Sequence, residues 1–379
     1  MSRLSVATAE PRSRTARRVA GLAGERMSVL GLVSPRSALR GVAAEAELRR
    51  WRRVHVSALY ERIWRQAADL LGANLRRMSV EDLELSLDGR VTRVRWEWTE
   101  LESVEAQRRA LDKPLVHRLL TERNVPLPAA VQLTLADPRP GFAFLRREPA
   151  GLVVKPSRSG GGFGVTCGVR RRTDLIRACL AAARYDGRLV AERHVAGDVY
   201  RVLVLDGEPL AVVRKRPPRL VGDGRSSIGA LIESENRRRL QARGAAGICL
   251  IRPDLDLVLT LRDQGFGLRS VAPTGRSFAA KRSTGDAGAE DADVVDVDRV
   301  PGLTEAAVRA AAAVGLRLAG VDLATPDPHS ELSSAGGAVL EVNATPGLHH
   351  HYLVADTRQV RPVALPILER LLGGKDGAV

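Results

Sequence analysis

The chain has 379 residues, of which 44% are hydrophobic, 27% charged and 3% aromatic, and its net charge is +15. This balance is typical of a globular protein with a substantial core, and no apolar run approaches the roughly 18–20 residues of a membrane span, so we expect a cytoplasmic protein with no membrane partner. Because the arginines are spread over the whole chain and few aromatic side chains are available to stack on bases, a basic nucleic-acid-binding protein is the weaker alternative and we expect no specific nucleic-acid partner.

The first 110 residues divide into two parts. Residues 1–45 alternate Arg with small side chains, which predicts a basic arm without fixed structure. From Glu47 onward, apolar side chains recur every three or four residues as far as Leu71, which predicts a helix. Alternating residues around Asp88-Gly89 then predict a β-hairpin. We therefore expect a small N-terminal helix-plus-hairpin lobe over residues 46–110.

Strand and helix patterns alternate through the rest of the chain, which predicts an α+β (mixed α/β) protein rather than a Rossmann sheet. We expect a Pro-Gly loop near Pro140, and a cap on one helix from Thr173. The expected helices are 106–123, 173–183 and 304–315, and the expected strands are 151–155, 165–169, 188–195, 200–205, 209–214, 319–323 and 338–342. The corresponding domains are a central lobe (111–190), a C-terminal lobe (191–372) and a frayed tail (373–379).

A glycine-rich loop follows the strand that ends at Lys155. Its residues Gly160, Gly161, Gly162, Phe163 and Gly164 leave backbone N–H groups open to wrap a phosphate, although the tip of a flexible hairpin has the same composition.

Lysine is rare in this chain, since only five of the 59 Lys and Arg residues are lysines. Where Arg would serve for charge alone, a retained Lys indicates a need for a compact ammonium group, and chance survival is the alternative. Each lysine lies near a feature that suggests phosphate handling or at the chain's end: Lys113, Lys155, Lys215, Lys281 and Lys375.

Three oxygen-bearing side chains occur at the ends of two apolar strands. Glu341 and Asn343 are two residues apart, so they point to one face of their strand, and Asp322 ends a strand that can pair with it. Two carboxylates and an amide oxygen are hard ligands of the kind Mg²⁺ prefers. The alternative is a polar strand end that faces water.

Four motifs together resemble the ATP-grasp fold, in which two α+β lobes clamp ATP, here preceded by the small N-terminal lobe. They are Asp112-Lys113, residues 153–164, residues 191–197 and residues 341–347. The likeness covers roughly residues 106–372 and is greatest to the ATP-grasp part of cyanophycin synthetase and of bifunctional glutathione-forming ligases. We expect no Mur-ligase-like domain, so the two-step chemistry of those larger proteins is not assumed.

The resemblance implies a role for each matching residue. Lys113, Lys155 and the glycine loop would hold the ATP phosphates, Glu192 would accept from the adenine amine, and Arg193 and Val195 would offer backbone contacts. Relatives carry an acidic ribose contact where this chain has Val199, so Asp198 is the candidate substitute. The remaining candidates are phosphate-stabilising or catalytic residues (Arg201, Lys215, Arg216, Arg282), metal ligands (Asp322, Glu341, Asn343) and substrate contacts (Lys281, Ser283, Gly347, His351).

These expectations describe an ATP- and Mg²⁺-dependent carboxylate–amine ligase, with Mn²⁺ as an alternative metal, that works through an acyl phosphate. Its substrates would be small molecules or peptides that carry a carboxylate and an amine, and a homodimer is one arrangement left open. Val199, and Asp286 at a position where relatives have glycine, keep open a non-catalytic nucleotide-binding regulator. An acid–thiol ligase is a further alternative within the same fold.

The three histidines at 349–351 allow three interpretations: a Zn²⁺ site, a substrate contact by His351, or plain packing. The whole interpretation requires that the acidic trio and the early lysines converge around one nucleotide tail.

Overall fold

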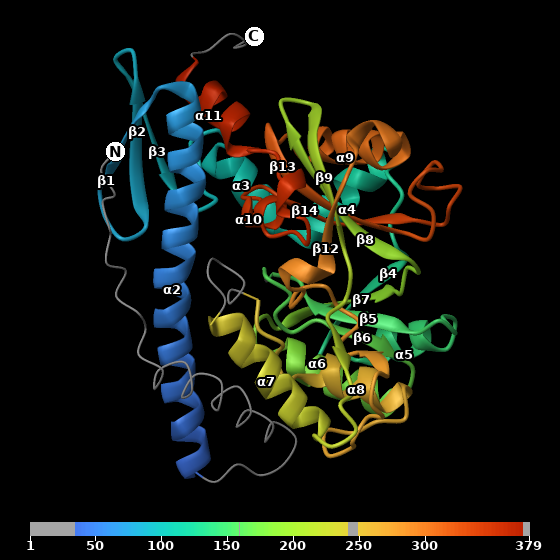
Figure 1. The fold of residues 1–379 in the computed structure, drawn as a ribbon. Coiled ribbons are helices and arrows are strands. Elements are labelled where there is room, and N and C mark those ends of the chain that lie inside the picture. Colours follow the sequence, from blue (N-terminus) through green and yellow to red (C-terminus); the bar gives the residue numbers. More distant parts are fainter. Residues whose placement is uncertain (1–34, 159, 242–248, 374–379) are drawn as a thin grey trace.

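The computed structural model describes residues 35–158, 160–241 and 249–373, with side chains from residue 53 on. Every strand pairing in this part of the chain is antiparallel. Three regions surround the middle of the molecule: an N-terminal lobe beside a long helix, a lower lobe with a four-stranded sheet, and an upper lobe with a five-stranded sheet (Figure 1). The α+β class expected from the sequence is confirmed.

The N-terminal lobe packs a three-stranded meander against the long helix α2. Trp64, Tyr60 and Ile63 of α2 are at most 1% exposed and form the centre of this core. The last helix, α11, returns from the far end of the chain to pack on α2, so the lobe combines both ends of the described chain (Figure 1). Its elements are α2 (Pro35–Leu71), β1 (Asn74–Arg77), β2 (Asp82–Leu87), β3 (Arg90–Arg95) and α11 (Ala364–Leu372).

The lower lobe has a four-stranded sheet in the order β4-β7-β5-β6. Helices α5 and α6 pack on it around the buried residues Leu152, Val154 and Leu175. The elements are β4 (Ala130–Thr134), α5 (Arg139–Leu145), β5 (Leu152–Pro156), β6 (Thr166–Val169), α6 (Arg172–Ala182) and β7 (Arg188–Arg193).

A helical extension with a two-stranded ribbon adjoins this lobe. Helix α8 lies between two cores, because Leu255 and Leu259 pack with the four-stranded sheet while Leu257 and Leu261 pack with α7 and the ribbon. The elements are β10 (Arg219–Val221), α7 (Ile228–Gln241), α8 (Leu255–Asp263) and β11 (Ser277–Ala279).

The upper lobe is a five-stranded sheet in the order β12-β9-β8-β13-β14. Helix α9 covers one face through its alanines, and α3 and α4 pack beside it. The elements are α3 (Val104–Leu111), α4 (Lys113–Glu122), β8 (Asp198–Leu205), β9 (Glu208–Lys215), β12 (Ala292–Val295), α9 (Pro301–Val314), β13 (Leu318–Thr325), β14 (Ala338–Asn343) and α10 (His349–Tyr352). Short 3-10 turns are η3 (Ala289–Asp291), η4 (Val297–Arg299) and η5 (Thr357–Gln359).

Several expected elements differ in the structure. The helix expected from Glu47 already begins at Pro35, so residues 35–45 are helical, whereas residues 1–34 and 374–379 lie outside the described residues. The helix expected over 106–123 is two helices, because the chain turns at Asp112, whose carboxylate accepts the Leu115 N–H of α4 at 3.2 Å.

Two further expectations are wrong. The segment around Pro140 is the helix α5 and not a loop, since proline is tolerated in a first helical turn. Helix α6 begins at Arg172, so Thr173 lies inside it and does not cap it.

Candidate active site

The open face of the five-stranded sheet carries a row of charged side chains. Strand pairing sets Lys215 opposite Val199, Arg201 opposite Asp322, and Asp322 opposite Glu341. Side chains of directly opposed residues share a face, so these charges lie on the face away from α9. The expected pairing of the Asp322 strand with the Glu341 strand is confirmed.

Arg201 and Asp322 form a bidentate ion pair at the centre of this row. Arg201 Nε donates to Asp322 Oδ1 at 2.8 Å and Nη2 donates to Oδ2 at 2.6 Å. Burial disfavours the carboxylate charge, but Arg201 outweighs burial and lowers the pKa of Asp322. The carboxylate is therefore ionised at neutral pH.

The two lysines predicted for phosphate lie at the edge of the same row. Lys113 Nζ, from the start of α4, is 3.0 Å from Glu341 Oε1. Lys155 Nζ, from β5 of the lower lobe, donates to the Leu340 carbonyl of β14 at 3.2 Å and is 2.7 Å from Glu192 Oε1. The early lysines and the late carboxylates therefore meet where the lower and upper lobes join.

Burial alone would discharge Lys155, since a buried ammonium loses its hydration. The carboxylates of Glu192 and Glu341 outweigh that cost and raise the pKa of Lys155. A full positive charge is thus held at the junction of the lobes.

The oxygen ligands expected for Mg²⁺ fit that ion in their chemistry. Asn343 uses its amide nitrogen to donate to the Gly320 carbonyl at 3.2 Å, a bond that does not use its amide oxygen. Asp322 and Glu341 each have a cation as partner, but a carboxylate offers about four lone-pair positions and can serve a metal as well. Among the described residues no group of three or more His, Cys, Asp and Glu side chains could hold a metal ion.

The glycine loop lies against the segment 281–286. Gly161, Gly162 and Gly164 have φ of 63°, 69° and 73°, a region that favours glycine. Arg252 donates from Nη2 to the Gly161 carbonyl at 3.1 Å, and its guanidinium lies 4.3 Å from the centre of the Phe163 ring.

The segment 281–286 contains an ion network that was not predicted from the sequence. Lys281 is fully buried, and its Nζ lies 2.5 Å from Asp254 Oδ2 and 2.8 Å from Asp286 Oδ2. Arg252 Nη2 is 2.5 Å from Asp286 Oδ1, so the residue that replaces a family glycine is the centre of the network.

Two more predicted site residues border this network. Ser283 donates from Oγ to Asp256 Oδ2 at 2.8 Å, and Arg282 pairs with Asp263 at 3.0 Å. Lys281 and Ser283 therefore have protein partners here, and their expected contacts with substrate stay predictions.

The remaining candidates lie around the link between the two sheets. Gly197 has φ of 102°, and a Cβ there would overlap the Thr325 carbonyl at the end of β13. The Arg193 N–H donates to the Ala129 carbonyl at 2.8 Å and is therefore already engaged, and Val195 lies in the link itself. Asp198 is 3.7 Å from Arg214.

Arg216 lies beyond the end of β9. Its Nη1 pairs with Asp293 at 3.0 Å, so it does not join the Arg201 row by any contact in the described chain.

The three histidines form the short helix α10 after Gly347. His349 Nδ1 and the Tyr60 hydroxyl are 2.9 Å apart, while His351 is 2% exposed and neither of its ring nitrogens has a partner in the described chain. Burial and the nearby Arg201 lower the pKa of His351 to about 3, so its ring is neutral.

We expect the unfolding free energy of His351→Leu to decrease less in mild acid than that of the unsubstituted protein. A pKa of about 3 in the folded protein against 6.5 in the unfolded chain means that unfolding binds a proton, so stability falls as the pH drops below 6.5 toward 3. Between pH 6.5 and 5 this group contributes at most about 2 kcal/mol to that loss. Urea unfolding at both pH values measures it, with His117→Leu on the exposed face of α4 as the control. If the unfolding free energy of His351→Leu fell with pH as steeply as that of the unsubstituted protein, the lowered pKa of His351 would be contradicted.

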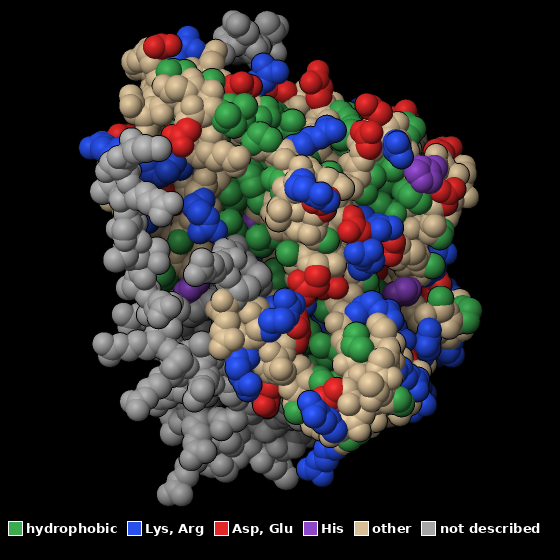
Figure 2. Space-filling model, viewed as in Figure 1, with side chains coloured by type: hydrophobic (Ala, Val, Ile, Leu, Met, Phe, Trp, Pro, Cys, Tyr) green, Lys and Arg blue, Asp and Glu red, His purple; other side chains and the backbone are tan. Residues whose placement is uncertain are grey.

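Positive side chains do not gather into a single patch on the face shown in Figure 2, where Lys and Arg alternate with Asp and Glu. Many arginines are also paired with carboxylates, such as Arg238 with Glu235 and Arg358 with Asp356.

No helix in the described ranges is both long and apolar enough to cross a membrane.

Comparison with known proteins finds similarity to ligases. The chain is 30% identical over 270 residues to the cyanophycin synthetase of Trichormus variabilis, which covers 69% of this chain and 29% of that protein. It is 31% identical over 272 residues to that of Synechocystis, covering 69% and 30% respectively. It is 24% identical to the glutathione biosynthesis bifunctional protein GshAB of Clostridium perfringens, covering 63% and 31%. The chain thus spans less than a third of the length of these relatives.

Among solved structures, a bifunctional glutathione synthetase from Pasteurella multocida superposes with a TM-score of 0.53 at 20% identity, covering 88% of this chain and 46% of that one. No protein-family model matches the chain. The likeness shows a common fold and confirms the fold expected from the sequence motifs.

Proposed function

We propose that this chain, a member of the ATP-grasp superfamily, is an ATP- and Mg²⁺-dependent ligase that joins a carboxylate to an amine. One observation carries the proposal: Lys113 and Lys155, from separate segments, reach Glu341 and the Leu340 carbonyl on one strand. Two ammonium groups beside a strand of metal-type oxygens suit a triphosphate and its metal. The homology to ligases supports the same reaction class.

The reaction would proceed in two steps. A substrate carboxylate oxygen attacks the γ-phosphorus of ATP, the bond from that phosphorus to the β–γ bridging oxygen breaks, and ADP leaves. The amine nitrogen then attacks the acyl carbon, the carbon–oxygen bond to the phosphate breaks, and inorganic phosphate leaves as the nitrogen loses a proton. An amide or peptide bond results.

The chain's own residues would supply position and charge rather than a nucleophile. Lys113 and Lys155 would bind phosphate oxygens, and Arg201 would hold Asp322 ionised and oriented. Asp322, Glu341 and Asn343 would hold Mg²⁺, which when bound neutralises charge on the phosphoryl oxygens. Arg216, Arg282, Ser283 and Gly347 keep their expected roles as part of this proposal, as does the cytoplasmic location. Lys281, which is fully buried, is assigned to the ion network with Asp254 and Asp286 instead.

The decisive experiment measures ADP release with Mg²⁺ across a panel of amino acids and short peptides. We expect release that needs both a carboxylate and an amine, with mass spectrometry showing an amide product. A thiol acceptor in place of the amine would instead indicate an acid–thiol ligase. Release that is independent of acceptor and of Mg²⁺ would contradict the proposal.

A regulatory nucleotide-binding protein is the second candidate. It is favoured by the Arg201–Asp322 pair, in which both carboxylate oxygens already accept hydrogen bonds. For such a protein, calorimetry would detect ATP binding of equal strength with and without Mg²⁺, and no acceptor would stimulate turnover.

A further inference from the structure

A second region of the sheet face contains a buried lysine that forms no ion pair with any other described residue. Lys215, at the end of β9, is 7% exposed. In contrast to Lys113, Lys155 and Lys281, its ammonium makes no hydrogen bond or ion pair with any other residue that the structure describes. A buried charge is costly unless it is paired, so an unpaired one indicates a partner that arrives from outside.

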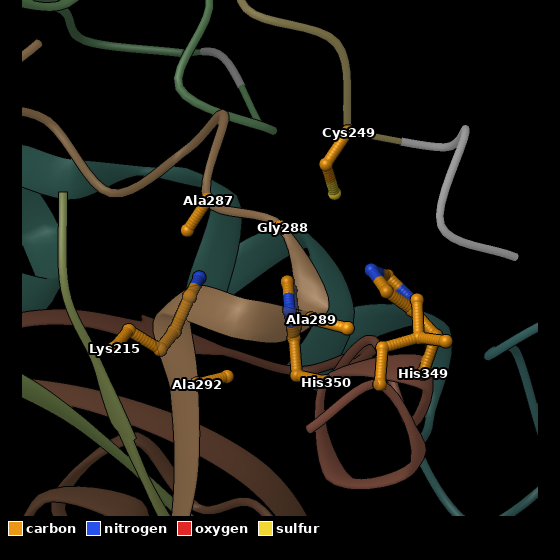
Figure 3. Close-up of a pocket in the computed structure, with 9 residues that line it drawn as sticks. Lys215, Cys249, Ala287, Gly288, Ala289, Ala292, His349 and His350 are labelled. Carbon is orange, nitrogen blue, oxygen red and sulfur yellow. The ribbon is translucent and has the colours of Figure 1, made fainter. Parts of the chain in front are cut away.

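Lys215 points into a pocket between β9, η3 and α10 (Figure 3). Cys249 approaches from the opposite side, and His349 and His350 form the third wall. The described residues that line the pocket include neither Asp nor Glu. The pocket is therefore positively charged, with polar groups directed inward.

The imidazoles of this pocket complement an anion. Burial, and then the charge of Lys215, lower the pKa of His350 well below its usual value, so the ring stays neutral. A neutral imidazole still has one N–H to donate. Burial and the nearby Arg201 lower the pKa of Lys215 itself to about 8, which leaves it mostly protonated at pH 7.

The position of the pocket relates it to the proposed reaction. Strands β9, β8, β13 and β14 are neighbours, so Lys215 lies three interstrand spacings, roughly 14 Å, from the strand that meets Lys113 and Lys155. Asp322 and Arg201 lie between them. Asp322 would thus lie between a substrate carboxylate bound at Lys215 and the ATP phosphates bound at Lys113 and Lys155.

We propose that the Lys215 pocket binds a carboxylate of the acid substrate, with the Lys215 ammonium as its counter-ion and the α10 imidazoles as hydrogen-bond donors. This inference rests on the proposed ligase function and assigns a place in the fold to the carboxylate of its acid substrate. Phosphate is the other anion that such a pocket can hold, and the test separates the two.

The test uses the scarcity of lysine in this chain. Competitive acetylation with acetic anhydride, followed by peptide mass spectrometry, reports the reactivity of each lysine separately. The full-length protein is acetylated in the presence of L-glutamate, L-aspartate or alanyl-alanine, and each of these ligands is compared with its carboxamide counterpart. Separate reactions contain inorganic phosphate, or ATP and Mg²⁺. We expect at least one carboxylate to slow labelling of Lys215 while its carboxamide does not, and ATP to slow labelling of Lys113 and Lys155 only.

Alkylation of Cys249 by iodoacetamide gives a second readout of the same pocket. Cys167 and Cys179 are buried, whereas Cys249 is partly exposed in the pocket wall. The carboxylate that protects Lys215 should also slow Cys249 alkylation.

Substitution provides a further test, made with the carboxylate that protects Lys215 from labelling. Lys215→Met removes an unpaired buried charge, so we expect a higher melting temperature together with roughly tenfold to hundredfold weaker use of the acid substrate and an unchanged KM for ATP. Arg214→Met is the matched control for the KM of the acid, since Arg214 lies on the opposite face of β9. Its partner Asp293 keeps Arg216, while Asp198 loses a contact of 3.7 Å. This control variant should leave the KM for the acid unchanged.

The possible outcomes distinguish failure of the Lys215 pocket from failure of the proposed ligase function. Protection of Lys113 and Lys155 by ATP without protection of Lys215 by any carboxylate would overturn the pocket and leave the ligase. Protection of Lys215 by phosphate or ATP but by no carboxylate would assign the pocket to phosphate and overturn the proposal. A lower melting temperature in Lys215→Met would show a structural role instead. Protection of Lys215 by a carboxylate, with no ATP effect on the other lysines, would support the pocket and count against the ligase.

Discussion

Glu341→Gln is expected to lower Mg²⁺-dependent ADP formation by at least about 1,000-fold. A metal contributes several kcal/mol of transition-state charge stabilisation, and each 1.36 kcal/mol corresponds to a factor of ten in rate. The side chain is 32% exposed and its partner Lys113 is 18% exposed, so losing the ion pair should cost the fold no more than about 1 kcal/mol. Steady-state ADP release and the melting temperature, measured on one preparation, separate the two effects.

The matched control for this variant is Glu331→Gln. Glu331 is an exposed carboxylate between β13 and β14 whose partners are Ser333 and Ser334, so the change is chemically identical but remote from the Lys113 contact. We expect its turnover to equal that of the unsubstituted protein. If Glu341→Gln retained the same turnover as this control, Glu341 would not be a metal ligand.

Local sequence patterns predicted those elements whose environment differs between their two faces. The hairpin of β2 and β3 has the Asp-Gly turn expected of it, with φ of 49° at Asp88 and 79° at Gly89. The pairing of β13 with β14 was predictable because one face of each strand contacts α9 while the other carries the charged side chains.

Helix α8 was missed for the opposite reason. Its leucines at 255, 257, 259 and 261 alternate with other residues in the manner of a strand. In the structure they form two helical stripes, one toward each of two cores, so the helix is buried on both sides and lacks the single apolar face that identifies a surface helix.

The site residues that were predictable are those that share one strand or belong to one recognised motif. Glu341 and Asn343 share a face because strand geometry requires it, and the approach of Lys113 and Lys155 followed from the resemblance of their motifs. The network around Lys281 could not be predicted in this way. Its partner Asp254 lies 27 residues away at the start of α8, and no periodicity connects that position with a loop.

Lys281→Met is expected to destabilise the protein by about 3–5 kcal/mol. Lys281 is 0% exposed and pairs with Asp254 and Asp286, so the substitution leaves Asp254 without this cation and the buried Asp286 with Arg252 alone. Urea unfolding should show the loss directly, and ATP turnover per folded molecule should change little. A raised KM for substrate with unchanged stability would instead support the substrate contact that the sequence predicted.

A second substitution tests whether the loss comes from an unpaired charge. Asp254→Asn, added to Lys281→Met, neutralises the carboxylate that lost its cation, and Asn can still cap α8, so we expect part of the stability to return. Arg358→Met removes a cation from Asp356 at an 88% exposed position and should leave the stability unchanged, because water screens the remaining charge. If the double variant were no more stable than Lys281→Met, the loss would come from packing around the lysine stem rather than from its charge.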